Sequence, residues 1–240
     1  MPDGWRDTLE QRITHWRHLD DDERDRLGDL AGELILTKHW EAARGFELTE
    51  EMQLLIAAQA ALLVLGLDIG HYREVGAIIV HPSTVVVRGP RHAAVPGLMT
   101  DAPLSVLGQA AHRGPIVIAW GAVRNDARHP ERGHNVVFHE FAHKLDMLDD
   151  VIDGTPPMPR SELERWVEVC TREYESLQAG GDRFLSDYAG VNPGEFFAVA
   201  TEAFFDRPVD MARQKPELYE ALAGFYRQDP ATRVARKAHW

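Results

Sequence analysis

Apolar residues recur at helical spacing over most of this chain. The pattern predicts helices over 5–18, 23–37, 49–65, 135–148, 161–178, 193–205 and 211–227. Between the third and fourth of these, short runs rich in β-branched residues and bounded by proline and glycine have the composition of strands. These runs are Val75–Val80, Thr84–Val87 and Pro115–Trp120. The pattern therefore predicts an N-terminal helical layer, a small mixed sheet and a helical C-terminal half.

Capping residues and turn-rich segments refine this picture. The acidic run Asp20–Glu23 can cap the second helix and complement its dipole, and Thr49 can cap the third. Residues 124–134 are polar and rich in turn formers, which predicts a surface loop. Residues 233–240 are weakly basic, and we expect them to form a solvated tail.

Composition excludes several classes of protein. The chain has 26 basic and 38 acidic residues, a net charge of −12, so a broad basic face for nucleic acid is not expected. The longest apolar run, residues 54–67, is too short and too interrupted to cross a bilayer, and no signal peptide is visible. Cys170 is the single cysteine, which excludes an internal disulfide and a CxxC metal site. We therefore expect a cytoplasmic protein without a membrane or direct nucleic-acid partner, in which histidine and carboxylate would hold any metal.

The strongest chemical signal is the HExxH sequence from His139 to His143, because it lies within a predicted helix. Residues four apart share one helical face, about 6 Å apart along the axis, so both imidazoles can point at one ion. Glu140 can then reach a water on that ion. The other residues of this helix are largely apolar, so its polar side chains would be costly to bury without a partner. We therefore predict one zinc ion here.

A catalytic zinc usually has three protein ligands and a water, so one more ligand is needed. Glu202 is the favoured candidate, because it interrupts the apolar stretch from Phe196 to Phe205, where a buried carboxylate needs a partner. Three other residues remain as alternatives, namely Asp149, Glu162 and Glu164. The latter two are also explained as the solvated start of a helix.

Further residues near these segments have two possible roles each. Glu195 follows Asn192 and Pro193 and can close a capping box, which we favour, or it can hold a substrate amine or orient a ligand. Tyr188 can donate its hydroxyl to a developing oxyanion, or it can have a purely structural role, which is commoner for tyrosine. Asp146 can accept the distal N–H of an imidazole, or it can pair at the surface.

At these residues the sequence resembles the Mlc titration factor A family of zinc-dependent peptidases, itself similar in its catalytic part to anthrax lethal factor. The matching segments keep one order over about residues 35–230: Gly45–Glu50, His139–Asp149, Glu195–Glu202 with Phe204 and Phe205, and Phe225–Pro230. The resemblance implies the metal ligands His139, His143 and Glu202, with Glu140 as general base. It also implies aminopeptidase activity on small substrates and binding of the glucose-responsive repressor Mlc.

These expectations combine into one model. The fold is α+β and zincin-like, a single unit over 1–240 with a helical and sheet part to about residue 130 and a metal-binding helical part from about 131. The protein would hydrolyse a peptide or protein substrate, with Glu140 accepting a proton from a zinc-bound water. The rival hypothesis is a regulatory protein-binding module, with a Mlc-like repressor as its partner, whose zinc site is structural or vestigial.

Overall fold

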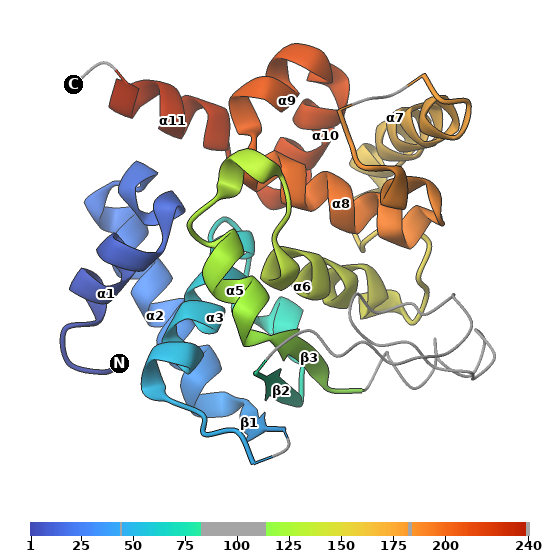
Figure 1. The fold of residues 1–240 in the computed structure, drawn as a ribbon. Helices are drawn as coiled ribbons and strands as arrows, with labels where there is room; N and C mark the ends of the chain where they lie inside the picture. Colours follow the sequence, from blue (N-terminus) through green and yellow to red (C-terminus); the bar gives the residue numbers. More distant parts are fainter. Residues whose placement is uncertain (44, 83–113, 182–183, 239–240) are drawn as a thin grey trace.

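The computed structural model describes residues 1–43, 45–82, 114–181 and 184–238 (Figure 1). Its N-terminal layer contains α1 (Trp5–Arg12), the 3-10 turn η1 (Thr14–His18), α2 (Asp21–Thr37) and α3 (Glu50–Leu63). The helix predicted over 5–18 is interrupted, because Ile13 has an extended backbone and Thr14 N–H donates to the carbonyl of Ala127. The predicted caps are confirmed: Asp20 forms a capping box with Glu23, and the Thr49 side chain accepts from Met52 N–H.

Three short strands form the described part of the sheet, in the order β1 (His39–Ala42), β2 (Ala77–His81) and β3 (Ile116–Ala119). All three are parallel, with His39 opposite Ala77 and Ile78 opposite Ile116. The expectation of a mixed sheet is therefore wrong for the described strands. Parallel neighbours need a crossover, and the buried helix α3 lies in the connection from β1 to β2. The predicted strand Thr84–Val87 lies outside the described residues.

The rest of the described chain is helical. Its α-helices are α5 (Trp120–Asp126), α6 (Val136–Asp146), α7 (Arg160–Gln178), α8 (Pro193–Asp206), α9 (Pro208–Gln214), α10 (Pro216–Tyr226) and α11 (Pro230–Ala238). Short 3-10 turns connect several elements: η2 (Ile69–Tyr72), η3 (Pro130–Arg132), η4 (Met147–Asp149) and η5 (Asp187–Gly190). The helices containing residues 139 and 202 thus lie within one or two residues of their predicted bounds.

Three predictions for the chain after β3 are wrong in detail. The range 211–227 is not one helix, because Pro216 starts α10 after the break at Lys215. Residues 124–126 belong to α5 rather than to a loop. The expected solvated tail is instead α11, where Arg233 Nε contacts Glu23 Oε1 of α2 at 2.7 Å.

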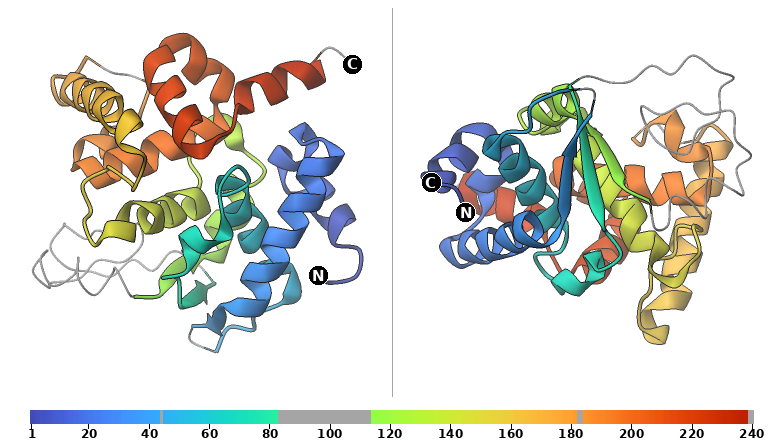
Figure 2. Two further views of the ribbon diagram at one scale, coloured as in Figure 1. Left: turned by 180° about the vertical axis from the view of Figure 1, so that it is seen from behind. Right: turned by 90° about the horizontal axis from the view of Figure 1, so that it is seen from below.

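Helix α6 occupies the centre of the molecule (Figure 1). It packs on α3 and β3 from the N-terminal part and on α8 from the C-terminal part, as the two further views also show (Figure 2). All of its residues from Val136 to Asp146 are buried, in one hydrophobic core that continues through both parts. Among the described residues, no helix combines the length and apolarity that crossing a bilayer needs.

Candidate metal centre

The start of α6 is fixed by buried hydrogen bonds. The Asn135 side chain accepts from the backbone N–H groups of Val137 and Phe138, both at 3.1 Å, and donates to Gln59 Oε1 of α3 at 3.0 Å. Asp126 Oδ2 accepts from Val136 N–H at 3.1 Å. The helix bearing the HExxH sequence is thus anchored to α3 and α5 within the core.

His139 and His143 lie one turn apart on the same face of α6. Their Nε2 atoms are 3.1 Å apart and their ring centroids 4.8 Å apart, nearly perpendicular. Both side chains are buried. The structure therefore brings together the two imidazoles that the sequence places on one helical face.

Glu195 of α8 completes this group. Its Oε2 lies 3.1 Å from His139 Nε2 and 3.4 Å from His143 Nε2. One ligand atom from each of these three residues lies within 4.8 Å of the other two. The predicted N-cap is present, because Asn192 Oδ1 accepts from Glu195 N–H at 2.9 Å. The favoured prediction that Glu195 closes a capping box is wrong, because its carboxylate contacts the two imidazoles instead.

Glu202 has a different position from the expected one. Its Oε1 lies 2.7 Å from His139 Nδ1, and its Oε2 accepts from the backbone N–H of Asn135 at 2.5 Å. The side chain is buried, so the expectation that this carboxylate needs a partner is correct. That partner is Nδ1 of His139, whereas Nε2 of the same ring faces Glu195. The structure therefore does not bring Glu202 into the group of potential ligand atoms.

This group of residues fits a metal ion. Glu195 Oε2 completes no hydrogen bond although it lies 3.1 Å from an imidazole nitrogen. Burial works against a charged His139, but the carboxylates of Glu195 and Glu202 outweigh it and raise its pKa to about 10. The two carboxylates therefore make the space around His139 favourable for a cation. Two imidazoles and one carboxylate are ligand types used by catalytic zinc sites.

Glu140 lies beside the group without entering it. Its side chain is buried, and its Oε1 has no hydrogen-bond partner. Burial raises the pKa of Glu140 to about 7, although the neighbouring His139 and His143 oppose the rise. A carboxylate with a free oxygen and a pKa near neutrality has the properties of a general base.

Tyr188 lies in η5, on the approach to α8. Its ring centroid is 5.9 Å from that of His139. Burial raises the pKa of Tyr188 above its ordinary value, and a hydrogen bond with Glu195 adds to the effect. The hydroxyl therefore stays protonated at neutral pH and can donate a hydrogen bond in the site.

The other candidates do not belong to the group of potential ligands. Asp149, Glu162 and Glu164 are exposed. Asp146 is buried, and its Oδ2 accepts from Gly154 N–H at 3.0 Å. Its Oδ1 and His143 Nδ1 both lack a hydrogen-bond partner, so Asp146 does not accept from this imidazole in the structure.

The chain matches the family model described as glucose-regulated metallo-peptidase M90 over residues 1–227. It is 34% identical over 239 residues to Mlc titration factor A of Serratia proteamaculans, covering 97% of this chain and 89% of that protein. It is 34% identical over 223 residues to Mlc titration factor A of Edwardsiella ictaluri, covering 90% of this chain and 84% of that protein. A Synechocystis protein named slr2042, described as uncharacterized, is 32% identical over 237 residues, covering 96% of this chain and 86% of the relative. The resemblance drawn from the sequence is therefore confirmed, and this chain belongs to the glucose-regulated metallopeptidase M90 family.

Proposed function

We propose that this protein is a zinc-dependent peptidase in which His139, His143 and Glu195 hold the metal ion. The observation that carries the proposal is the convergence of three buried ligand atoms from α6 and α8 within 4.8 Å. Glu195 replaces Glu202 as the third ligand, because Glu202 contacts the opposite nitrogen of His139. A zinc ion held there would supply Lewis-acid chemistry and lower the pKa of a bound water toward neutrality.

Glu140 is the general base of this proposal. Its carboxylate accepts a proton from the attacking water and returns a proton to the leaving amine. The apolar surroundings that raise its pKa make it a stronger base than an exposed glutamate. Tyr188 donates its hydroxyl to the oxyanion that develops at the scissile carbonyl.

Glu202 positions His139 in this arrangement. Since Glu202 Oε1 accepts from Nδ1 of His139, the proton of that neutral imidazole stays on Nδ1. The lone pair of Nε2 is then free to bind the metal ion. Its second oxygen accepts from the backbone N–H of Asn135, so one carboxylate fixes both the ring and the start of α6.

The substrate and partner are further proposals. Aminopeptidase-like activity follows from the family resemblance. Binding of a Mlc-like repressor is supported by the names of the Serratia and Edwardsiella relatives, both Mlc titration factor A. The single, half-buried cysteine suits a reducing compartment, and we place the protein in the cytoplasm.

The rival is a regulatory module with a structural zinc site. Structural zinc is usually enclosed by four protein ligands, whereas in the part of the chain that the structure describes three ligand residues converge here. Oε1 of Glu140, next to the first histidine, is buried without a hydrogen-bond partner. Burying such an oxygen is costly, and a structural zinc site would gain nothing from it. These features favour the peptidase.

The test is to substitute Glu140→Gln and to measure zinc content and hydrolysis of chromogenic aminoacyl substrates. Glutamine keeps the size of the side chain but cannot act as the base, so we expect bound zinc and a rate lowered by about 10²–10⁴. Glu162→Gln, an exposed position, is the matched control and should keep full activity. Wild-type activity in Glu140→Gln would overturn the general-base assignment, and a zinc-free wild type would overturn the proposal as a whole.

A further inference from the structure

The segment 150–159, which leads from η4 to α7, passes beside the first turn of α8 (Figure 1). Gly154 lies in this segment, buried, with φ at +74°. This left-handed conformation strains a residue that has a side chain. A Cβ at this position would also overlap the backbone carbonyl of Pro193, the first residue of α8. Glycine is therefore required here both by the backbone conformation and by the close approach to α8.

The remaining backbone groups of Gly154 bind two further helices. Its N–H donates to Asp146 Oδ2 of α6 at 3.0 Å, and its carbonyl accepts from Nε1 of Trp166 of α7, also at 3.0 Å. Trp166 is buried, and its ring packs on Phe197 of α8 with the centroids 5.7 Å apart. One glycine thus joins α6, α7 and α8. We call Asp146, Gly154 and Trp166 the three-helix junction.

The junction extends to the residue before Glu195. A Cβ at Gly194 would lie 3.4 Å from Asp146 Oδ2, so this carboxylate borders the first turn of α8. Glu195 follows directly, and its Oε2 lies 3.1 Å from Nε2 of His139. The carboxylate that holds the junction glycine therefore also borders the turn that presents Glu195 to the imidazoles.

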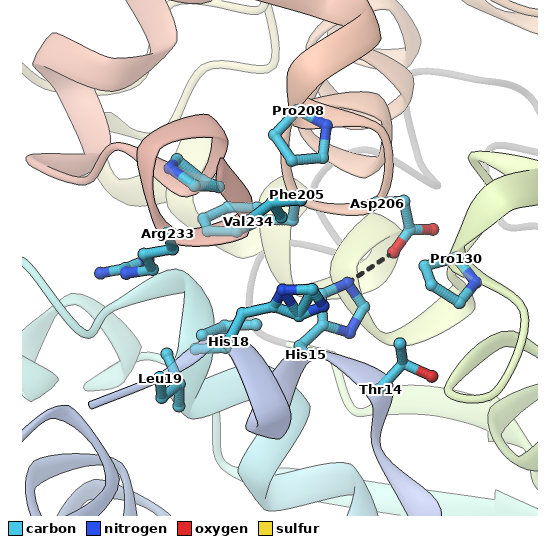
Figure 3. A pocket seen from close by; sticks show the side chains of 12 residues that line it. Thr14, His15, His18, Leu19, Pro130, Phe205, Asp206, Pro208, Arg233 and Val234 are labelled. Carbon is cyan, nitrogen blue, oxygen red and sulfur yellow. Dashed lines mark ion pairs between the residues drawn. The ribbon is translucent and has the colours of Figure 1, made fainter. Parts of the chain in front are cut away.

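The other end of α8 is held by a different contact. Figure 3 shows Asp206, the last residue of α8, with its Oδ1 3.0 Å from Nε2 of His15 in η1. This contact fixes the end of the helix that is remote from the metal centre. The three-helix junction, in contrast, lies against the turn that bears Glu195.

We propose that the three-helix junction positions Glu195 for metal binding, with Asp146 and Gly154 setting the distance between α6 and the first turn of α8. The inference rests on the proposed function, in which Glu195 joins His139 and His143 as a zinc ligand. Ligand groups must be held within about 0.5 Å of the productive geometry, so a small displacement of this turn weakens binding. Asp146 and Gly154 act through Glu195 and are positioning residues.

The experiment compares the zinc affinity of Gly154→Ala and Gly180→Ala by competition with a fluorescent chelator. Both glycines have φ at +74°, so both substitutions strain the backbone equally. A Cβ at Gly180, however, would meet no atom of the described residues within 4 Å. We expect zinc affinity to fall by at least about ten-fold in Gly154→Ala and to stay unchanged in Gly180→Ala. Circular dichroism verifies that both variants fold.

A spectrum gives a second readout for the same pair. The visible absorption of bound Co²⁺ depends on the number and arrangement of its ligands, so it should change in Gly154→Ala and match the wild type in Gly180→Ala. A general loss of stability would not change the spectrum of the folded protein. Equal losses of zinc affinity in the two variants would assign the effect to backbone strain and overturn the proposal.

Two variants of Asp146 test the junction without adding atoms. Asp146→Asn keeps an oxygen that accepts from Gly154 N–H but loses the charge, whereas Asp146→Ala loses both. We expect zinc affinity to fall by about ten-fold in Asp146→Ala and to stay close to that of the wild type in Asp146→Asn. Equal losses would assign the effect to the charge and overturn the proposal. This pair also decides the question if Gly154→Ala does not fold.

Glu195→Ala separates failure of the junction from failure of the proposed function. Loss of zinc in Glu195→Ala, together with wild-type affinity in Gly154→Ala or Asp146→Ala, would overturn the positioning role and leave the ligand set in place. Wild-type zinc affinity in Glu195→Ala would overturn the ligand set and the positioning role with it.

Discussion

Glu202 Oε1 lies 2.7 Å from Nδ1 of His139, on the opposite side of the imidazole from Glu195. One helix, α8, therefore contacts both nitrogens of one histidine, through two glutamates that are two turns apart. The first carboxylate faces the site where ligand atoms converge, and the second orients the ring from outside.

This relationship predicts the effect of Glu202→Gln. The amide keeps the volume of the side chain but weakens the acceptor that holds the Nδ1 proton of His139, so zinc affinity should fall by about 10–100-fold. Competition with a fluorescent chelator measures the change. Glu220→Gln, on the exposed face of α10, should bind zinc like the wild type. An unchanged affinity in Glu202→Gln would contradict the positioning role.

Tyr188→Phe tests the oxyanion donor. Removal of one such donor should lower kcat by about 10²–10³ and leave KM nearly unchanged, because the hydrogen bond strengthens only in the transition state. Steady-state kinetics with a chromogenic substrate measures both constants. A rise in KM at constant kcat would instead assign Tyr188 to substrate binding.

Asn135→Ala should destabilise the fold by about 2–4 kcal/mol. The change removes the cap of α6 and leaves Oε1 of the buried Gln59 without its donor. Thr49→Ala removes a cap with a single hydrogen bond and should cost about 1 kcal/mol. Urea unfolding of both variants gives the comparison, and equal losses would contradict the coupling of α6 to α3.

The pH dependence of stability in zinc-free protein should reflect Asp146. Burial raises the pKa of Asp146 from its ordinary value of 3.8 to about 7, so the folded state binds a proton that the unfolded state has already released. Its contribution is therefore fully present below about pH 4 and is lost as the pH rises to about 7, at up to about 1.4 kcal/mol per pH unit.

Asp146→Asn removes this titration. From about pH 5 to about pH 7 the wild type should lose about 2 kcal/mol more stability than the variant, as measured by urea unfolding. Asp149→Asn changes the same charge at an exposed position and should follow the wild type. Parallel curves for wild type and Asp146→Asn would show that burial does not raise this pKa.

Much of the helical structure could be predicted from the sequence, because its signals are local. Helical spacing and the caps at Thr49 and Asn192 determine where helices begin, and both caps are present. The HExxH spacing alone places His139 and His143 on one face. The burial of Glu202 also follows from its apolar neighbours.

The choice between Glu195 and Glu202 could not be made from local signals. Both are buried on α8, and which one reaches Nε2 of His139 depends on how α8 is positioned against α6. A metal-binding histidine usually donates its other ring N–H to an acceptor. This rule indicates two carboxylates beside His139, one as a ligand and one as the acceptor, and could have pointed to Glu195 as well as Glu202. The helix α11 was missed because its contact with α2 joins residues far apart in the sequence.

Zinc content is the most direct test of the central claim, that His139, His143 and Glu195 converge on one ion. After dialysis against a weak chelator, mass spectrometry under native conditions should find one zinc ion in the wild type and in Glu202→Gln. It should find none in Glu195→Ala, whose fold circular dichroism verifies. A full complement of zinc in Glu195→Ala, together with its loss in Glu202→Gln, would contradict the account and return the third ligand to Glu202.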